Sequence, residues 1–194
     1  MVEAADRGVG AILQTVDRLG LTSNTVVIFT NDNGGEWLSN GGPLFNRKWT
    51  VWEGGIRVPA IVKWPGRIRG GTASDQPAIT FDWSASIIAA AGATIPPQYE
   101  GMNLFPILEG RAPQVERTFF WRSAPNSNRT QQAVRLGDWK LVVDANHLLL
   151  FNLRTDIGER RDMAAQRPDL VRRLRTLLSD WTRGVDADAA VASK

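Results

Sequence analysis

The most constraining feature of this sequence is a short apolar segment, residues 26–30, which runs directly into the polar sequence Asp-Asn-Gly-Gly at residues 32–35. Its apolar residues are nearly continuous rather than alternating, which is typical of a strand buried on both faces in a parallel sheet. Residues 2–19 are predicted to form an amphipathic helix, because apolar side chains recur there at three- and four-residue spacings. A helix followed by a buried strand predicts an α/β fold, in which helices pack on a sheet.

The rest of the chain divides near residue 112. A long loop containing three Trp residues is predicted first, and its length and aromatic content are typical of a functional loop. Beyond residue 112, short apolar segments separated by turn signals predict an antiparallel meander. We therefore expect two domains, residues 1–112 and residues 113–194. The predicted elements are a loop over 34–59, a strand within 59–68, helices over 79–91, 104–109 and 168–183, and a frayed tail after 183.

Composition excludes several classes of site. The 194 residues include no Cys and a single His, His147, so disulfides, zinc–thiolate sites, cysteine nucleophiles and His-rich metal sites are excluded from them. The net charge of +3 comes from scattered basic residues, which suits a small anionic substrate and argues against a nucleic-acid partner. No apolar run is long enough for a membrane span. The first ten residues lack the pattern of a secretory signal, so either the protein is cytoplasmic or its true N-terminus is missing.

Asp32 and Asn33, at the end of the predicted strand, are the first candidates for a functional site. A carboxylate and an amide carbonyl are hard oxygen ligands, which suit calcium or magnesium. The alternative is an ordinary turn, because Asp-Asn and Asn-Gly favour turns through local hydrogen bonds. These residues by themselves favour the turn.

Lys48, in the Trp-rich loop, is the second candidate. Its ammonium group could hold an anionic oxygen as a point charge, although most lysines are simply exposed. Glu53 and Arg57 are predicted to form an ion pair that fixes this loop. His147, at the start of an apolar strand, is predicted to be a structural or surface residue.

Taken in order, these motifs resemble the C-terminal part of a sulfatase. Asp-Asn-Gly at residues 32–34 is followed by Lys-x4-Glu-Gly-Gly-x-Arg-Val-Pro at residues 48–59 and by Trp-Pro-Gly at residues 64–66. A lone Asp-Asn-Gly is a weak signal, whereas the whole series is specific, and similar segments extend along nearly the whole chain. The resemblance implies an alkaline-phosphatase-like α/β fold with a partial central sheet, in which residues 1–112 are the C-terminal part of the catalytic domain and the remainder is a small antiparallel subdomain.

The resemblance also implies roles for particular residues. Asp32 and Asn33 would bind a calcium ion, and Lys48 would contact the sulfate group of a sulfate ester, either a small molecule or a sulfated sugar. Calcium would act as a Lewis acid on the sulfate oxygens, and Lys48 would add electrostatic stabilisation. Residues 37–46 are the local candidate for substrate contacts. A full-length family member is expected to be periplasmic or secreted.

The sequence departs from the family in one important respect. Sulfatases use a formylglycine made from Cys or Ser in a Cys/Ser-x-Pro-x-Arg motif near the N-terminus, and the Ser-Ala-Pro-Asn-Ser sequence at residues 123–127 has Ser where that motif needs Arg. We therefore expect a chain that begins partway through the fold, needs the missing N-terminal part, and exposes apolar surface at an incomplete central sheet. Two alternatives stay open. One is an inactive truncated fragment that at most binds calcium or a sulfated ligand. The other is a phosphatase or phosphodiesterase of the same superfamily, which Asn33 and the single His disfavour.

Overall fold

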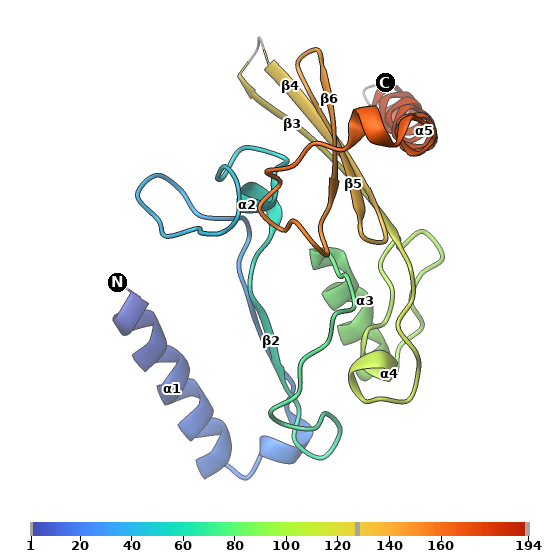
Figure 1. The fold of residues 1–194 in the computed structure, drawn as a ribbon. Helices are drawn as coiled ribbons and strands as arrows, with labels where there is room; N and C mark the ends of the chain where they lie inside the picture. Colours follow the sequence, from blue (N-terminus) through green and yellow to red (C-terminus); the bar gives the residue numbers. More distant parts are fainter. Residues whose placement is uncertain (1, 127–128, 193–194) are drawn as a thin grey trace. The chain divides into compact units, whose positions relative to one another are not determined.

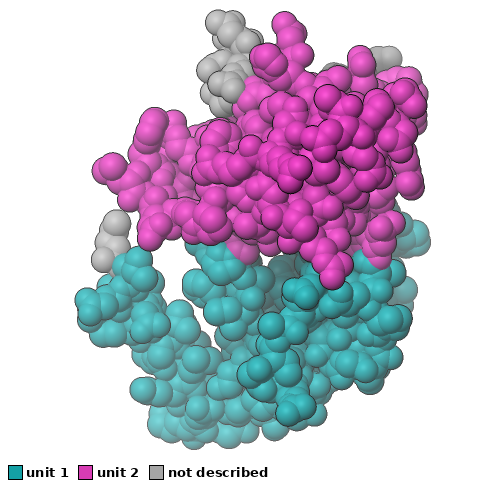
Figure 2. All heavy atoms as spheres, in the orientation of Figure 1, with its two compact units in different colours: residues 1–31, 59–115 teal, residues 32–58, 116–194 magenta. Residues whose placement is uncertain are grey.

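We describe the protein from a computed structural model, which covers residues 2–126 and 129–192. The chain forms two compact units, each built from two stretches of sequence (Figure 2). The first unit comprises residues 1–31 and 59–115, and the second comprises residues 32–58 and 116–194. The second unit thus takes in the Trp-rich loop together with the C-terminal residues. The domain division at residue 112, which concerns the complete family fold, stays a prediction.

The first unit contains three of the predicted helices and a two-stranded sheet (Figure 1). The three α-helices and β1 lie where the sequence predicts them, to within one residue, and β2 lies within the predicted segment 59–68. A short 3-10 helix is also present and was not predicted. The bounds of these elements are α1 (Val2–Arg18), a 3-10 helix (Thr22–Asn24), β1 (Val27–Thr30), β2 (Ala60–Lys63), α3 (Thr80–Ala90) and α4 (Phe105–Leu108).

The environment of β1 differs from the prediction. β1 pairs antiparallel with β2, so that Val27 lies opposite Lys63. Phe29 on β1 is 44% exposed and Ile61 on β2 is 62% exposed. The prediction of a parallel strand buried on both faces is therefore wrong for this chain, because β1 has only one partner strand in the described part of the chain. The apolar surface expected at this sheet is exposed.

The interior of the first unit is organised around Asp82. The carboxylate of Asp82 accepts hydrogen bonds from the backbone N–H of Ile79 (2.8 Å) and of Met102 (2.9 Å). The first bond caps the N-terminus of α3, and the second fixes the segment that leads into α4. The rings of Trp64 and Phe105, also in the first unit, pack edge to face, with 4.8 Å between their centroids.

The second unit is built on a four-stranded antiparallel sheet in which each strand pairs with the next along the chain, as predicted for a meander. A long helix follows the sheet, and a one-turn helix lies in the Trp-rich loop (Figure 1). The bounds are α2 (Glu53–Ile56), β3 (Thr118–Asn126), β4 (Arg129–Leu136), β5 (Trp139–Asp144), β6 (His147–Asn152), a 3-10 helix (Ala164–Gln166) and α5 (Pro168–Ala192).

The C-terminal helix is longer than the sequence suggested. α5 continues through residues 184–192, which we expected to be frayed. Alanine, the best helix former, is frequent in this segment. Asp186 also pairs with Arg122 of β3 at 2.6 Å, which holds the added turns against the sheet.

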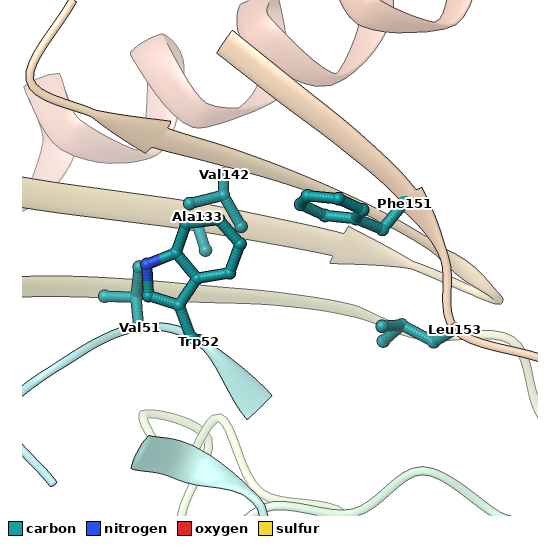
Figure 3. Close-up of a cluster of buried hydrophobic side chains, with 6 residues drawn as sticks. All are labelled: Val51, Trp52, Ala133, Val142, Phe151 and Leu153. Atoms are coloured by element: carbon teal, nitrogen blue, oxygen red, sulfur yellow. The ribbon is translucent and has the colours of Figure 1, made fainter. Parts of the chain in front are cut away.

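The sheet of the second unit is covered on both faces, because neighbouring residues of each strand point to opposite sides. On one face, Val134, Leu141 and Leu150 pack against Leu170, Leu174 and Leu178 of α5. On the other face, Ala133, Val142 and Phe151 pack against Val51 and Trp52 of the Trp-rich loop (Figure 3). The Trp-rich loop therefore leaves the end of β1, and its residues Val51 and Trp52 form part of the core of the second unit.

Within the described residues, none of the helices combines the length and the apolar character that a membrane crossing requires.

Candidate functional site

Asp32 and Asn33 follow β1 after one residue, Asn31, and their side chains offer oxygen atoms that the described residues do not use. Asp32 is exposed, and its carboxylate makes no hydrogen bond or ion pair with any described residue. Asn33 is half-buried, and its Nδ2 donates to the carbonyl of Gly34 at 3.1 Å. That bond uses one of the two N–H donors of Nδ2, and Oδ1, the acceptor atom of the Asn33 amide, is available to a ligand.

The glycines after Asn33 allow two segments of the loop to meet. Gly34 N donates to Gly55 O at 2.9 Å. A Cβ atom on Gly34 would lie 1.9 Å from Gly54 O, and a Cβ atom on Gly54 would lie 2.3 Å from Asn46 O. Side chains at these positions would force the backbones apart. The Gly-Gly pairs of both motifs therefore serve close packing of one segment on the other.

Lys48 is held beside the same glycines by its backbone. Its N–H donates to Gly35 O at 2.8 Å, which brings the predicted sulfate contact next to the segment that carries Asp32 and Asn33. The Lys48 side chain is half-buried, and its Nζ lies 5.4 Å from the centroid of the Trp49 ring. No carboxylate among the described residues pairs with it, so its charge is available to an anion.

The backbone around Lys48 is in an unusual conformation. Asn46 and Trp49 have φ angles of 65° and 75°, in the left-handed region that side chains disfavour. Such residues persist where the surrounding structure holds them, and they concentrate at functional sites. The hydrogen bonds from Gly54 N to Phe45 O and from Lys48 N to Gly35 O hold this segment on both sides.

A buried charge cluster lies beneath this loop and anchors it to the sheet. Arg57 Nε donates to Glu53 Oε2 at 2.6 Å, which confirms the predicted ion pair. Glu53 Oε1 also lies 2.8 Å from Nζ of Lys140 on β5, and the same Nζ lies 2.8 Å from Oε1 of Glu159. Glu159 Oε2 in turn accepts the backbone N–H of Glu53 at 2.7 Å. The Lys140 side chain is completely buried between the two carboxylates.

The two carboxyl groups of this cluster have opposite pKa shifts. Burial works to raise the pKa of Glu53, but the charges of Lys140 and Arg57 outweigh it and hold that pKa below its ordinary value. Burial also raises the pKa of Glu159, and the attraction of Lys140 offsets only part of that increase. Glu53 is therefore the stronger acid of the pair, because it has a second cationic partner, Arg57, which Glu159 lacks.

Lys140 and Glu159 were not predicted to be part of the site. One signal was present, because Lys140 interrupts an apolar strand sequence, Trp-Lys-Leu-Val-Val, and lysine is almost never fully buried without a partner. No feature of the sequence near residue 159 indicated that Glu159 would contact the Trp-rich loop. A second anchor was also missed: Gln131 Oε1 accepts the backbone N–H of Val51 at 3.3 Å.

The two remaining candidates are His147 and the Ser-Ala-Pro-Asn-Ser sequence at residues 123–127. His147 begins β6 and is exposed, as predicted for a surface histidine. Residues 127 and 128, within and beside the rejected Ser-Ala-Pro-Asn-Ser sequence, lie outside the described residues. Ser123, the first residue of that sequence, donates through Oγ to Trp49 O at 2.7 Å.

Comparisons with known proteins identify the family and the fold of the chain. Residues 1–93 match the Sulfatase family model. Arylsulfatase A of Bos taurus is 39% identical over 142 residues, which are 70% of this chain and 28% of that protein. Steryl-sulfatase of Rattus norvegicus is 36% identical over 133 residues, which are 62% of this chain and 23% of that protein. The crystal structure of Ps i-CgsB in complex with k-i-k-neocarrahexaose superposes with a TM-score of 0.87 at 28% identity, over 93% of this chain and 41% of that one.

This chain belongs to the sulfatase family. The structural match confirms the α/β sulfatase fold that the motifs implied. The matched residues span about a quarter of the length of the curated sulfatases.

The side-chain oxygens of Asp32 and Asn33 in this sulfatase chain fit part of the ligand set of a calcium ion. Asp32 supplies a carboxylate without a partner among the described residues, and Asn33 supplies an amide oxygen, both of which are ligands that calcium prefers. Calcium takes about six to eight oxygen ligands, and the described residues contain no group of three His, Asp or Glu arranged to hold a metal. Asp32 and Asn33 therefore fit two ligand positions of a larger set.

Proposed function

We propose that the protein containing this chain hydrolyses a sulfate ester, and that Asp32, Asn33 and Lys48 form part of its active site. The observation that carries the proposal is the 2.8 Å hydrogen bond from Lys48 N to Gly35 O. It joins the segment of the predicted sulfate contact to the segment of the predicted metal ligands. An unpaired carboxylate, a free amide oxygen and an unpaired ammonium group thus belong to adjoining backbone segments.

Each residue has a distinct role in this proposal. Asp32 and Asn33 help to hold a calcium ion, which when bound supplies Lewis-acid stabilisation of the sulfate oxygens. Lys48 binds and orients the sulfate group and stabilises the negative charge that develops on its oxygens. Sulfatases are generally metal-dependent, which agrees with this division of roles.

The buried charge cluster holds the Trp-rich loop, which carries Lys48, in place on the sheet. Glu53 is fixed by Arg57, Lys140 and Glu159, and it begins the short helix α2 that packs against Gly34. Movement of α2 would displace Gly34 and, with it, the neighbouring Asn33. We therefore assign Glu53, Lys140 and Glu159 a positioning role, which acts through the backbone of the loop.

The substrate class proposed here is a sulfated saccharide. The Ps i-CgsB structure, which this chain matches at 28% identity, was solved with a neocarrahexaose, an oligosaccharide. The 194 residues contain neither Cys nor a Ser-x-Pro-x-Arg sequence that could yield the formylglycine of the family. The contribution proposed for these residues is therefore to bind the metal and the sulfate group.

Calorimetric titration with calcium of the whole protein that contains this chain tests the metal assignment, because Asp32 and Asn33 supply two positions of a larger ligand set. We expect binding by the natural sequence, loss of binding in Asp32→Ala, and no change in Asp75→Ala. Asp75 is the matched control, because it is also exposed and its removal changes the charge equally. Equal calcium affinity in the natural sequence and Asp32→Ala would overturn the assignment, and so would a natural sequence that binds no calcium.

A further inference from the structure

The loop between the two parts of the proposed active site encloses a pocket of its own. The hydrogen bond from Lys48 N to Gly35 O closes residues 35–48 into a loop with a fixed neck (Figure 1). A pocket of about 240 Å³ lies within this loop. Ligand sites for drug-sized molecules are larger, about 300–1,000 Å³. The pocket is therefore of a size for a single ring rather than an extended ligand. Its lining includes Glu36, Trp37, Leu38, Ser39 and Arg47.

Trp37 lines this pocket, and Arg47 stacks on its ring. The guanidinium carbon of Arg47 lies 3.7 Å from the centroid of the Trp37 ring, so one face of the indole is covered. The side chain nevertheless remains 71% exposed. An exposed tryptophan held by a stacked arginine offers a rigid flat surface, and little side-chain entropy is lost when a ligand stacks on it.

The charges in the pocket cancel one another. Arg47 forms an ion pair with Glu36, and the same carboxylate accepts the backbone N–H of Trp37 at 3.0 Å. These hydrogen bonds, the backbone bond first, hold the pKa of Glu36 below its ordinary value, so the group is ionised at neutral pH. An ionised carboxylate only accepts hydrogen bonds. A ligand beside it must bring donors such as hydroxyl groups, and a second sulfate there would meet a negative charge and find no unpaired cation.

We propose that the pocket formed by Glu36, Trp37, Leu38, Ser39 and Arg47 binds an uncharged sugar ring that adjoins the sulfated unit of the substrate. A sugar ring combines a C–H face that stacks on an indole with hydroxyl donors for Glu36. A steroid or a simple aryl group has a flat face that can stack on the indole, but it lacks the hydroxyl donors of a sugar ring. The placement relative to the sulfated unit rests on the proposed role of Lys48, because Gly35 both lines the pocket and accepts the Lys48 hydrogen bond.

Nuclear magnetic resonance on the 194-residue chain tests this subsite. The probe is neoagarohexaose, an oligosaccharide without sulfate, and the signal is the indole N–H resonance of Trp37, assigned with Trp37→Phe. We expect a saturable shift of that resonance. Trp37→Ala should weaken binding by about tenfold, which corresponds to the loss of one stacking contact. Trp49→Ala is the matched control, because Trp49 is similarly exposed, at 62%, but does not line the pocket. Glu36→Gln keeps the shape of the pocket and should weaken binding through the loss of the charged acceptor.

Two further probes separate this proposal from that of the active site. Neocarrahexaose and cholesterol sulfate are titrated in the same way into the natural sequence and Lys48→Ala. The subsite proposal is overturned if the neutral oligosaccharide leaves the Trp37 resonance unmoved, or if only cholesterol sulfate shifts it. The proposed role of Lys48 fails independently if Lys48→Ala binds neocarrahexaose as tightly as the natural sequence does.

Discussion

The two compact units bury their apolar side chains to very different degrees. In the second unit, Val134, Leu141 and Leu150 lie in the sheet with no exposed surface. In the first unit, α1 has no buried residue, and Ile12 on this helix is 63% exposed. β1 is as apolar in sequence as β5, but β5 has a strand on each side and cover on both faces. Burial in this protein therefore follows from the number of neighbours that an apolar segment has, rather than from its own hydrophobicity.

The largest effect should come from the charge at the centre of the second unit. Lys140→Met leaves Glu53 and Glu159 buried without their shared cation, and breaking such a pair costs about 3–5 kcal/mol in the free energy of unfolding. Lys63→Met on the exposed strand β2 is the control, with an expected change within about 0.5 kcal/mol. Urea unfolding followed by circular dichroism measures both. If Lys140→Met proved as stable as the natural chain, the cluster would not anchor the loop.

A smaller difference is expected between apolar side chains of the two units. Leu174→Ala, in the core between α5 and the sheet, should lower the free energy of unfolding by about 2–5 kcal/mol. Ile12→Ala on α1 should change it by no more than about 0.5 kcal/mol, because the isoleucine is largely exposed. The same urea experiment compares them. Equal losses would show that α1 packs on apolar surface after all.

The smallest effect concerns the dependence of stability on pH. The pKa of Glu159 is raised in the folded state, so its favourable contribution is present below the ordinary value of 4.5 and is lost as the pH rises through the folded pKa. The pKa of Glu53 is lowered, so its contribution is present above 4.5 and is lost as the pH falls through its folded pKa.

Variants of these two residues should therefore differ from the natural chain in opposite ways. As the pH rises above 4.5, the natural chain should lose stability relative to Glu159→Gln. As the pH falls below 4.5, it should lose stability relative to Glu53→Gln. Unfolding free energies from urea titrations at several pH values give both slopes. Parallel pH profiles for the two variants would contradict the assignment of opposite shifts.

Local patterns predicted most of the secondary structure, and tertiary contacts account for the errors. The helix α1 and the meander β3–β6 follow from periodicity and turn residues. The ion pair of Glu53 and Arg57 was predictable because four residues separate the two. Whether β1 would be buried could not be predicted, because this depends on segments far away in the chain.

The contribution of the C-terminal residues to the candidate site was equally hidden from the sequence. Lys140 lies 87 positions after Glu53, and their pairing exists only once the Trp-rich loop has packed on the sheet. The extended part of α5 also contacts a residue that is distant in the sequence, Arg122. The roles of Asp32, Asn33 and Lys48 came from the family motifs and stay proposals, but the structure does bring the segments that carry them into direct contact.

The closed neck at Gly35 and Lys48 has a consequence for how such an enzyme could change over time. Residues 36–44 can be exchanged, shortened or lengthened while the bonds from Lys48 N to Gly35 O and from Gly54 N to Phe45 O keep both ends of the segment in place, because the entropic cost of closing a loop grows only slowly with its length. Variation that alters which substrate is preferred would then be separated from the residues proposed for the chemistry. Under the proposed role of this loop in sugar binding, residues 36–44 are the segment to transplant between related sulfatases when a new specificity is sought.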